Sequence, residues 1–273
     1  MVASAQAQDV SNYQGHYNWV HARAVIPNLV LGISRVTQAL GGPGTGSPDP
    51  DASWDWQQLK ANGLDRGGYH FFDPKLDGAA QARYFVETAA KLPGGIGPRD
   101  QFWLDNETAD GVAPGLVSQR AVEFMAELDS LVPHNPRGVY TFTNFALDGY
   151  CAGLGGRWLW LARPGSTVPL DPPPWQPREF VLWQWGQRDG TDADSFLGTV
   201  PEYHLWVAAF EPPPGPFRHL ADGTKSAAEI AAHRNESVEA LVRNSARSYT
   251  AHDLQVLENL LVPKGAPYYT VNP

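Results

Sequence analysis

The sequence predicts an α/β protein: an irregular, TIM-like (β/α) barrel over residues 1–210, followed by a small α+β domain. Three observations support this prediction. Short apolar runs alternate with helical patterns before residue 210, as expected of successive β-α units. Consecutive prolines within 211–216 exclude a helix and donate no hydrogen bonds to a sheet, which marks a linker. Residues 217–273 then change to a pattern of short helices.

Six apolar or aromatic runs predict the strands of the barrel. They are Val30 to Val36, Gly67 to Phe72, Phe102 to Asn106, Gly138 to Phe142, Trp158 to Ala162 and Val181 to Trp185. Helices are predicted around 81–89 and 121–128, because apolar side chains recur there every three or four residues. A doubly wound open sheet is the alternative, but residues 41–44 lack the glycine pattern of a phosphate-binding turn. Little helix follows Trp158, so the barrel is expected to be irregular.

The tail after the linker shows three helix-start signals. Ser226 with Glu229 forms a capping-box pattern, Ser237 precedes an apolar run, and Thr250 with Asp253 precedes another. The short segments before and after these helices, 217–220 and 266–270, can pair as strands. The sequence therefore predicts a small α+β module at 217–273.

The composition limits the classes of function. The 273 residues are 42% hydrophobic and 18% charged, which is typical of a folded protein. A formal net charge of −9 argues against binding to nucleic acid or to an anionic membrane surface. The single cysteine, Cys151, excludes an internal disulfide framework, and no Cys/His spacing is typical of a zinc site. We expect neither a metal nor another cofactor.

Targeting signals are also absent from the sequence. No run of 18 apolar residues is present, so membrane insertion is not expected. The first ten residues lack the basic and apolar regions of a secretory signal. We expect synthesis in the cytoplasm, with secretion as the alternative if the small residues at 3–7 are what remains of a removed signal.

Four acidic residues stand next to apolar runs and are the candidates for chemistry: Asp9, Asp105, Glu107 and Asp192. Asp105 and Glu107 are two residues apart, so on a strand their side chains share one face, roughly 6–7 Å apart along the chain. Carboxylates that face into a barrel reduce its stability, and parallel barrels build their active sites at the carboxyl ends of their strands. The pair therefore indicates acid catalysis, while a solvated loop is the plainer alternative.

Several motifs, taken together in their order along the chain, resemble glycoside hydrolase family 25, the muramidases, over most of residues 8–210. The motifs are D-V-S-x-Y-Q-G at Asp9 to Gly15, G-G-Y-H-F-F at Gly67 to Phe72, D-x-E at Asp105 to Glu107, Y-T at Tyr140 and Thr141, L-W-L-A at Leu159 to Ala162, W-Q-W at Trp183 to Trp185, and D-x-D-x-F at Asp192 to Phe196. The resemblance implies an irregular barrel with an acidic groove. It also implies hydrolysis of the β-1,4 bond between N-acetylmuramic acid and N-acetylglucosamine in the glycan strands of peptidoglycan.

The resemblance also implies roles for the four acids. Glu107 matches the proton donor of the family, Asp105 the other half of its D-x-E pair, and Asp9 and Asp192 two further acids of the groove. Neighbouring carboxylates raise the pKa of a glutamate, as a general acid requires. Asp105 either attacks the anomeric carbon or orients the acetamido group of the substrate as the nucleophile, and we favour the second route.

Aromatic residues near these motifs are candidates for stacking on sugar rings. They are Tyr69, Tyr140, Trp160, Trp183 and Trp185, although barrel cores also contain aromatic residues. His70 lies within an apolar strand and is expected to be a hydrogen-bonded core histidine. Asn106 departs from the family pattern, which leads us to expect a small or branched apolar residue between the two acids.

The tail is similar to LysM-like wall-binding modules in its Asp222-Gly223-Thr224 turn and its Pro263-Lys264-Gly265 segment, although an extra helical stretch at 249–261 departs from them. Such a module would bind cell-wall sugars, or else serve in packing or oligomerisation. A wall-directed hydrolase without an export signal resembles a phage endolysin, which acts on the wall after its release. Two other functions stay open: a metal-dependent hydrolase on a barrel scaffold, and a non-catalytic cell-wall sugar-binding protein.

Overall fold

The computed structural model describes residues 4–40, 46–177 and 179–211. The predicted linker after Glu211 and the predicted module at 217–273 lie outside the described residues. No helix among the described residues is long and apolar enough to cross a membrane.

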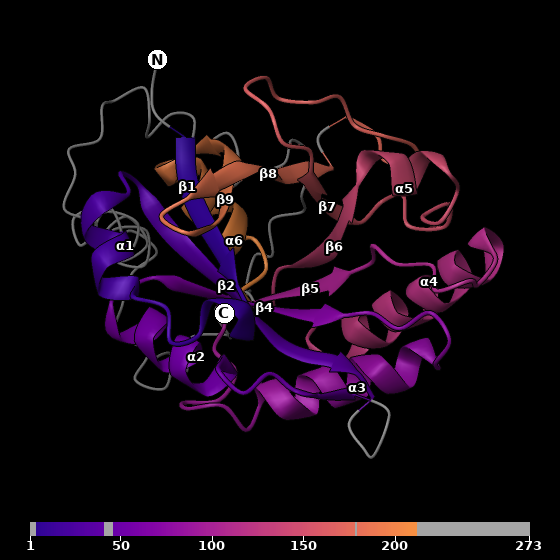
Figure 1. Ribbon diagram of the computed structural model, residues 1–273, viewed down its shortest axis with the longest axis horizontal. Coiled ribbons are helices and arrows are strands. Elements are labelled where there is room, and N and C mark those ends of the chain that lie inside the picture. The colour runs from indigo at the N-terminus through magenta and orange to yellow at the C-terminus, as the bar shows by residue number, and fades with distance from the viewer. Residues whose placement is uncertain (1–3, 41–45, 178, 212–273) are drawn as a thin grey trace, which may run out of the picture. The chain divides into compact units, whose positions relative to one another are not determined.

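The described residues form a closed barrel with one antiparallel wall, which confirms the predicted barrel fold (Figure 1). Its strands are β1 (Ser4–Val10), β2 (Leu29–Ala39), β4 (Asp65–Phe71), β5 (Gln101–Asp105), β6 (Arg137–Phe142), β7 (Trp158–Ala162), β8 (Phe180–Arg188) and β9 (Thr191–Thr199). Neighbours from β1 through β2 and on to β8 are parallel, whereas β9 runs antiparallel to both β8 and β1. The short β3 (Gly46–Pro48) pairs antiparallel with the end of β2 and is not one of the barrel strands.

Among the described residues the α-helices are α1 (Trp19–Val25), α2 (Ala52–Ala61), α3 (Gly78–Ala89), α4 (Pro114–Leu131), α5 (Thr143–Leu147) and α6 (Val200–Ala208). The last of them, α6, packs against β9 and β1, and its Tyr203 and Val207 belong to the cluster inside the barrel. Figure 1 shows α1 to α4 following one another around one side of the barrel. Three of these helices begin at recognisable signals: Asp77 caps α3, Pro114 opens α4, and Thr199 with Glu202 forms a capping box at α6.

The first strand uses the small residues that the sequence left open as a signal remnant. Ala5 and Ala7 are 0% and 3% exposed and belong to the cluster that fills the barrel together with Ile33 and Trp103. Alternate residues of a strand face the same side, so Asp9 follows these two alanines toward the carboxyl end of β1. Residues Ser4–Val10 are therefore part of the barrel wall.

A tight turn connects β8 to the antiparallel β9, and an Asp-Gly pair in the sequence indicates it. Asp189 and Gly190 join β8 to β9 and have φ angles of 54° and 79°. An Asp-Gly pair suits a two-residue hairpin because both positions take left-handed conformations. The turn lies at the same end of the barrel as the carboxyl ends of β1 and β8, and it brings Asp192 opposite Asp9 in the ladder.

A glycine makes room for the large side chains inside the barrel. A Cβ atom at Gly138 would lie 2.5 Å from the Trp103 ring and 2.4 Å from the carbonyl oxygen of Trp158. We expect Gly138→Ala to lower the free energy of unfolding by about 1–3 kcal/mol, as overpacked cores do. Chemical denaturation measures this change. The control is Gly115→Ala on α4, where a Cβ meets nothing within 4 Å and a small gain in stability is expected.

Candidate active site

One pocket lies at the carboxyl ends of the parallel strands. It is lined by Asp9, Val10, Ser11, Tyr13, Gln14, Arg35, Tyr69, Phe71, Asp105, Glu107, Tyr140, Trp160, Gln184 and Asp192. All four acids singled out from the sequence are in this lining. Asp9 stands near the end of β1, Asp105 ends β5, Glu107 follows it by two residues, and Asp192 is the second residue of the antiparallel β9.

Three of the five candidate aromatic residues share the lining and two do not. Tyr69, Tyr140 and Trp160 line the pocket, and the ring of Trp160 packs edge-on against both tyrosines. Trp183 packs into the cluster between barrel and helices, and Trp185 packs against that cluster. Successive residues of β8 face opposite sides, so the residue that reaches the pocket from this strand is Gln184 between them.

The carboxyls of the pocket are buried close together, and this raises their pKa values. Burial, with Asp192 as the next cause, raises the pKa of Asp9 to about 7, although Gln184 Nε2 donates to Asp9 Oδ2 at 2.8 Å. Burial also raises the pKa of Glu107, and the charge of Asp192 adds to it. These groups therefore retain protons at pH values where exposed carboxyls have lost them.

Asp105 is the most confined of these groups. It is 5% exposed, and its Oδ1 atom receives no hydrogen bond from any described residue. Burial raises the pKa of Asp105 well above its usual range, Glu107 and Asp9 raise it further, and Arg35 opposes them. A buried carboxyl oxygen without a donor is costly, and a substrate N–H group can supply the missing donor.

Asp194, the second acid of the D-x-D motif, is a further buried carboxyl that was not among the predicted site residues. It is 0% exposed, and Trp160 Nε1 donates to Asp194 Oδ1 at 2.7 Å. Burial raises the pKa of Asp194 well above its usual range, and Asp9, to which it is hydrogen-bonded, raises it further. The signal in the sequence was the spacing of two, which places Asp192 and Asp194 on the same face of a strand.

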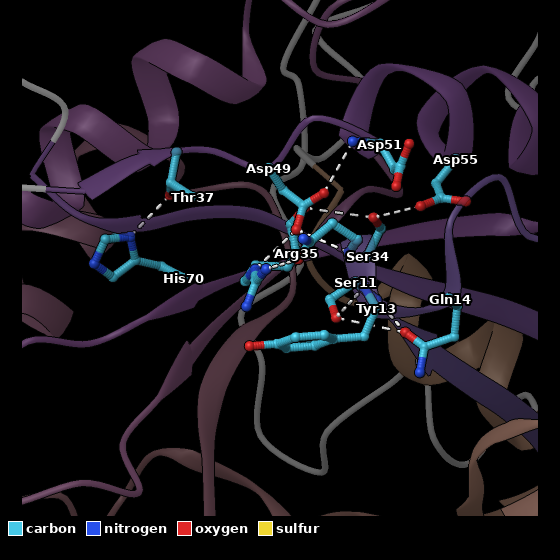
Figure 2. A network of polar contacts seen from close by, with 11 residues as sticks. Ser11, Tyr13, Gln14, Ser34, Arg35, Thr37, Asp49, Asp51, Asp55 and His70 are labelled. Atoms are coloured by element: carbon cyan, nitrogen blue, oxygen red, sulfur yellow. Dashed lines mark hydrogen bonds and ion pairs between the residues drawn. The ribbon is translucent and has the colours of Figure 1, made fainter.

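Arg35 provides a positive charge in this acidic pocket, and it too was missed. Figure 2 shows it between Asp49 and the ring of Tyr13: Arg35 Nε donates to Asp49 Oδ2 at 2.8 Å, and its guanidinium carbon lies 5.5 Å from the ring centroid. Asp49 Oδ1 in turn accepts from the backbone N–H of Asp51 at 2.9 Å. Tyr13 is 84% exposed at the rim. Arg35 is therefore held in place by its surroundings rather than by substrate.

Two residues near the motifs are core residues. His70 is 0% exposed, its ring nitrogens contact Thr37 Oγ1 at 2.8 Å and Gln81 Oε1 at 3.0 Å, and burial lowers its pKa to about 4. The expectation of a hydrogen-bonded core histidine is confirmed. Asn106, which departs from the expected apolar type, is also 0% exposed and lies outside the pocket lining.

A comparison with protein families decides the assignment. The model for glycosyl hydrolases family 25 matches residues 8–194, the segment that contains all four acids. The chain belongs to this family. It is therefore a glycoside hydrolase.

Individual relatives agree with the family 25 assignment. An uncharacterised protein of Escherichia coli K12, YegX, is 27% identical over 221 residues, which cover 76% of this chain and 74% of YegX. A muramidase structure from Trichobolus zukalii aligns with a TM-score of 0.64 and 24% identity, covering 76% of this chain and 100% of that one. A family GH25 lysozyme structure from Aspergillus fumigatus aligns with a TM-score of 0.65 and 22% identity over 76% and 99% of the two chains. At these identities the structures show the shared fold.

The acidic pocket of this family 25 hydrolase is expected to reduce its stability at neutral pH. Asp9 binds its proton more tightly in the folded state, with a pKa of about 7 against 3.8 for an unperturbed aspartate. The free energy of unfolding therefore falls as pH rises from about 4 to 7, and the full cost is present above pH 7. We expect Asp9→Asn to raise the melting temperature more at pH 8 than at pH 4. Asp148→Asn at an exposed position is the control, and an equal effect of Asp9→Asn at both pH values would contradict the prediction.

Proposed function

We propose that this family 25 enzyme is an N-acetylmuramidase that hydrolyses the β-1,4 bond between N-acetylmuramic acid and N-acetylglucosamine in peptidoglycan. The observation that carries the proposal is the pair Asp105 and Glu107 in one pocket, with the pKa of both raised by burial. Hydrolysis of a glycosidic bond needs one carboxyl that holds a proton and a second group on the other side of the anomeric carbon. The Trichobolus zukalii relative is described as a muramidase.

Glu107 is the proton donor in this proposal. Its side chain is half-buried at the pocket, and burial with the charge of Asp192 raises its pKa. A raised pKa keeps the carboxyl protonated until it meets the leaving sugar oxygen. Asp192 supports this state through its charge, and Asp9 does so at pH values where it is ionised; neither transfers the proton itself.

Asp105 acts through the acetamido group of the substrate. Its Oδ1 atom lacks a donor among the described residues, and the acetamide N–H of N-acetylmuramic acid supplies one. This hydrogen bond orients the acetamide oxygen toward the anomeric carbon, where it serves as the nucleophile. Direct attack by Asp105 on the anomeric carbon is the alternative route.

The proposed sugar contacts are Tyr69, Tyr140 and Trp160 in the pocket and Tyr13 at its rim. Trp160 is 2% exposed, so it offers an edge and supports the two tyrosines, whereas the ring of Tyr13 is open to solvent. An exposed aromatic face backed by a guanidinium suits stacking on a sugar ring. We propose that Tyr13 holds a sugar next to the one that is cleaved.

Digestion of purified peptidoglycan tests the proposed activity. Borohydride reduction of the products followed by mass spectrometry identifies the new reducing ends, and a muramidase yields reduced N-acetylmuramic acid. Reduced N-acetylglucosamine would show a different bond specificity. Binding without new ends would indicate the non-catalytic sugar-binding protein. Loss of turnover in a chelator, restored by a divalent cation, would indicate the metal-dependent hydrolase.

The finer proposal is that the enzyme is a phage-endolysin-like protein whose residues 217–273 form a LysM-like wall-binding module. A linker of consecutive prolines supports separable domains, and a wall anchor raises the effective concentration of substrate. We expect deletion of 217–273 to leave cleavage of soluble glycan fragments nearly unchanged and to reduce lysis of whole cells. Turbidity assays on cells, with soluble fragments as the control, measure both. Equal lysis by the two proteins would rule out an anchoring role.

A further inference from the structure

Two polar side chains connect the carboxyls of Glu107 and Asp9 across the pocket. Tyr140 Oη donates to Gln184 Oε1 at 3.0 Å, and Gln184 Nε2 donates to Asp9 Oδ2 at 2.8 Å. Tyr140 is also hydrogen-bonded to Glu107. The chain of contacts therefore runs from Glu107 through Tyr140 and Gln184 to Asp9, and all four residues line the same pocket.

The number of hydrogens in this chain restricts its arrangements. A tyrosine hydroxyl has one hydrogen and donates to one acceptor at a time, whereas an amide side chain donates through nitrogen and accepts through oxygen. When Asp9 is ionised it only accepts, so the amide nitrogen of Gln184 faces it. The amide oxygen then faces Tyr140 and accepts the hydroxyl hydrogen. Glu107 receives no hydrogen from Tyr140 in this arrangement.

The reverse arrangement needs the opposite placement of one proton. If Asp9 is protonated and donates to Gln184, the amide is turned by 180° and its nitrogen faces the oxygen of Tyr140. The hydroxyl hydrogen of Tyr140 is then free for an ionised Glu107. Each fully hydrogen-bonded arrangement thus holds one proton on the pair, either on Glu107 or on Asp9.

We propose that Gln184 is a positioning residue that keeps the proton on Glu107 while Asp9 is ionised, because it holds the hydroxyl hydrogen of Tyr140 away from Glu107. The inference rests on the proposed function, in which Glu107 is the proton donor. Gln184 accepts the hydroxyl hydrogen of Tyr140, which would otherwise stabilise the ionised form of Glu107. It also stabilises the charge of Asp9, which in turn opposes ionisation of Glu107.

Other charged groups face these two carboxyls from the surrounding strands. Asp105 on β5 and Asp192 on β9 face Glu107, Asp192 and Asp194 on β9 face Asp9, and Arg35 on β2 faces Asp105. These groups are the same in the variants proposed below. A difference between the variants therefore reports on the hydrogen-bonded chain and not on the acidic surroundings.

Two substitutions are expected to move the pH profile of hydrolysis in opposite directions. Gln184→Met removes the acceptor of Tyr140, so the hydroxyl turns to Glu107, stabilises its ionised form and moves the basic limb of kcat to lower pH. Tyr140→Phe removes the hydroxyl that the ionised form of Glu107 would otherwise recruit, and it moves the basic limb to higher pH. Each displacement is expected to be roughly 0.5 to 1 pH unit, the size of one net hydrogen bond to a carboxylate. The assay is reducing-end release from peptidoglycan between pH 4 and 9.

A control and a second measurement separate the possible outcomes. Gln119→Met removes an amide donor to Glu123 on the exposed face of α4 and should leave the profile unchanged. Titration of ¹³C-labelled glutamate carboxyls, with the Glu107 signal assigned by its loss in Glu107→Gln, measures the same effect without turnover.

Displacement of the pH profile in one direction by both variants, or by neither, overturns the inference. If Gln184→Met does not fold, the pKa of Glu107 in Tyr140→Phe decides: a rise supports the inference, and no change or a fall overturns it. An absence of hydrolysis by the wild type overturns the proposed function instead.

Discussion

Glu107→Gln is expected to lower the release of reducing ends from purified peptidoglycan by at least about 100-fold while folding is retained. Glutamine keeps the size and the hydrogen-bonding shape of the side chain but has no proton to donate to the leaving sugar oxygen. Positioned acid catalysis contributes about 10²–10⁴-fold to a rate, so the loss should reach at least the lower bound. Binding of glycan fragments should weaken far less, because the variant loses an interaction made in the transition state.

The comparison for Glu107→Gln uses the other acids of the same pocket. Asp9→Asn and Asp192→Asn are expected to cost less, since their charge supports the site without transferring a proton. Rates are compared at matched thermal stability so that unfolding is not mistaken for lost chemistry. If Glu107→Gln kept more than about a tenth of the wild-type rate while Asp9→Asn or Asp192→Asn abolished it, the proton donor would have to be reassigned.

Asp105→Asn is expected to lower turnover as severely as Glu107→Gln. An amide cannot carry the negative charge that supports the positive charge developing at the anomeric carbon, whether Asp105 attacks directly or orients the acetamide. The variant should nevertheless fold, because it replaces a buried carboxyl whose Oδ1 has no donor among the described residues. Steady-state kinetics on peptidoglycan fragments should therefore show a large fall in kcat with a smaller change in KM.

Asp55→Asn is the matched control for this substitution. Asp55 is 0% exposed like the buried acids of the pocket, and burial raises its pKa to about 6, but it bonds Trp19 Nε1 and Ser34 Oγ outside the pocket lining. Asp55→Asn should change the melting temperature and leave kcat unchanged at temperatures below unfolding. A kcat of Asp105→Asn close to that of Asp55→Asn would contradict the role proposed for Asp105.

The sequence predicted those strands of the barrel that are buried on both faces. Trp158–Ala162 is a continuous apolar run and has the bounds predicted for it. The strands β1 and β9 were not predicted, because polar residues stand at alternate positions of β1 and the Asp192 carboxylate of β9 lines the pocket. The residues that make these strands functional therefore hide the apolar alternation by which a strand is recognised.

The same limit applies to the site. Motif spacing was sufficient to choose Asp9, Asp105, Glu107 and Asp192, and the structure places all four in one pocket. The side chains that hold them in place were not visible in the sequence, since the contact of Gln184 with Asp9 joins residues 175 positions apart. Such contacts depend on the register between strands, which a sequence pattern does not specify.

The antiparallel return of β9 has a consequence for the biosynthesis of the enzyme. During translation β1 leaves the ribosome first, but it lacks one of its two neighbours until residues 191–199 have been made. A nascent chain that ends earlier contains Asp9, Asp105 and Glu107 but neither the strand that closes the barrel nor the carboxylate of Asp192. Ribosome-bound intermediates are therefore expected to be inactive, and glycan cleavage begins only when the whole catalytic domain has emerged.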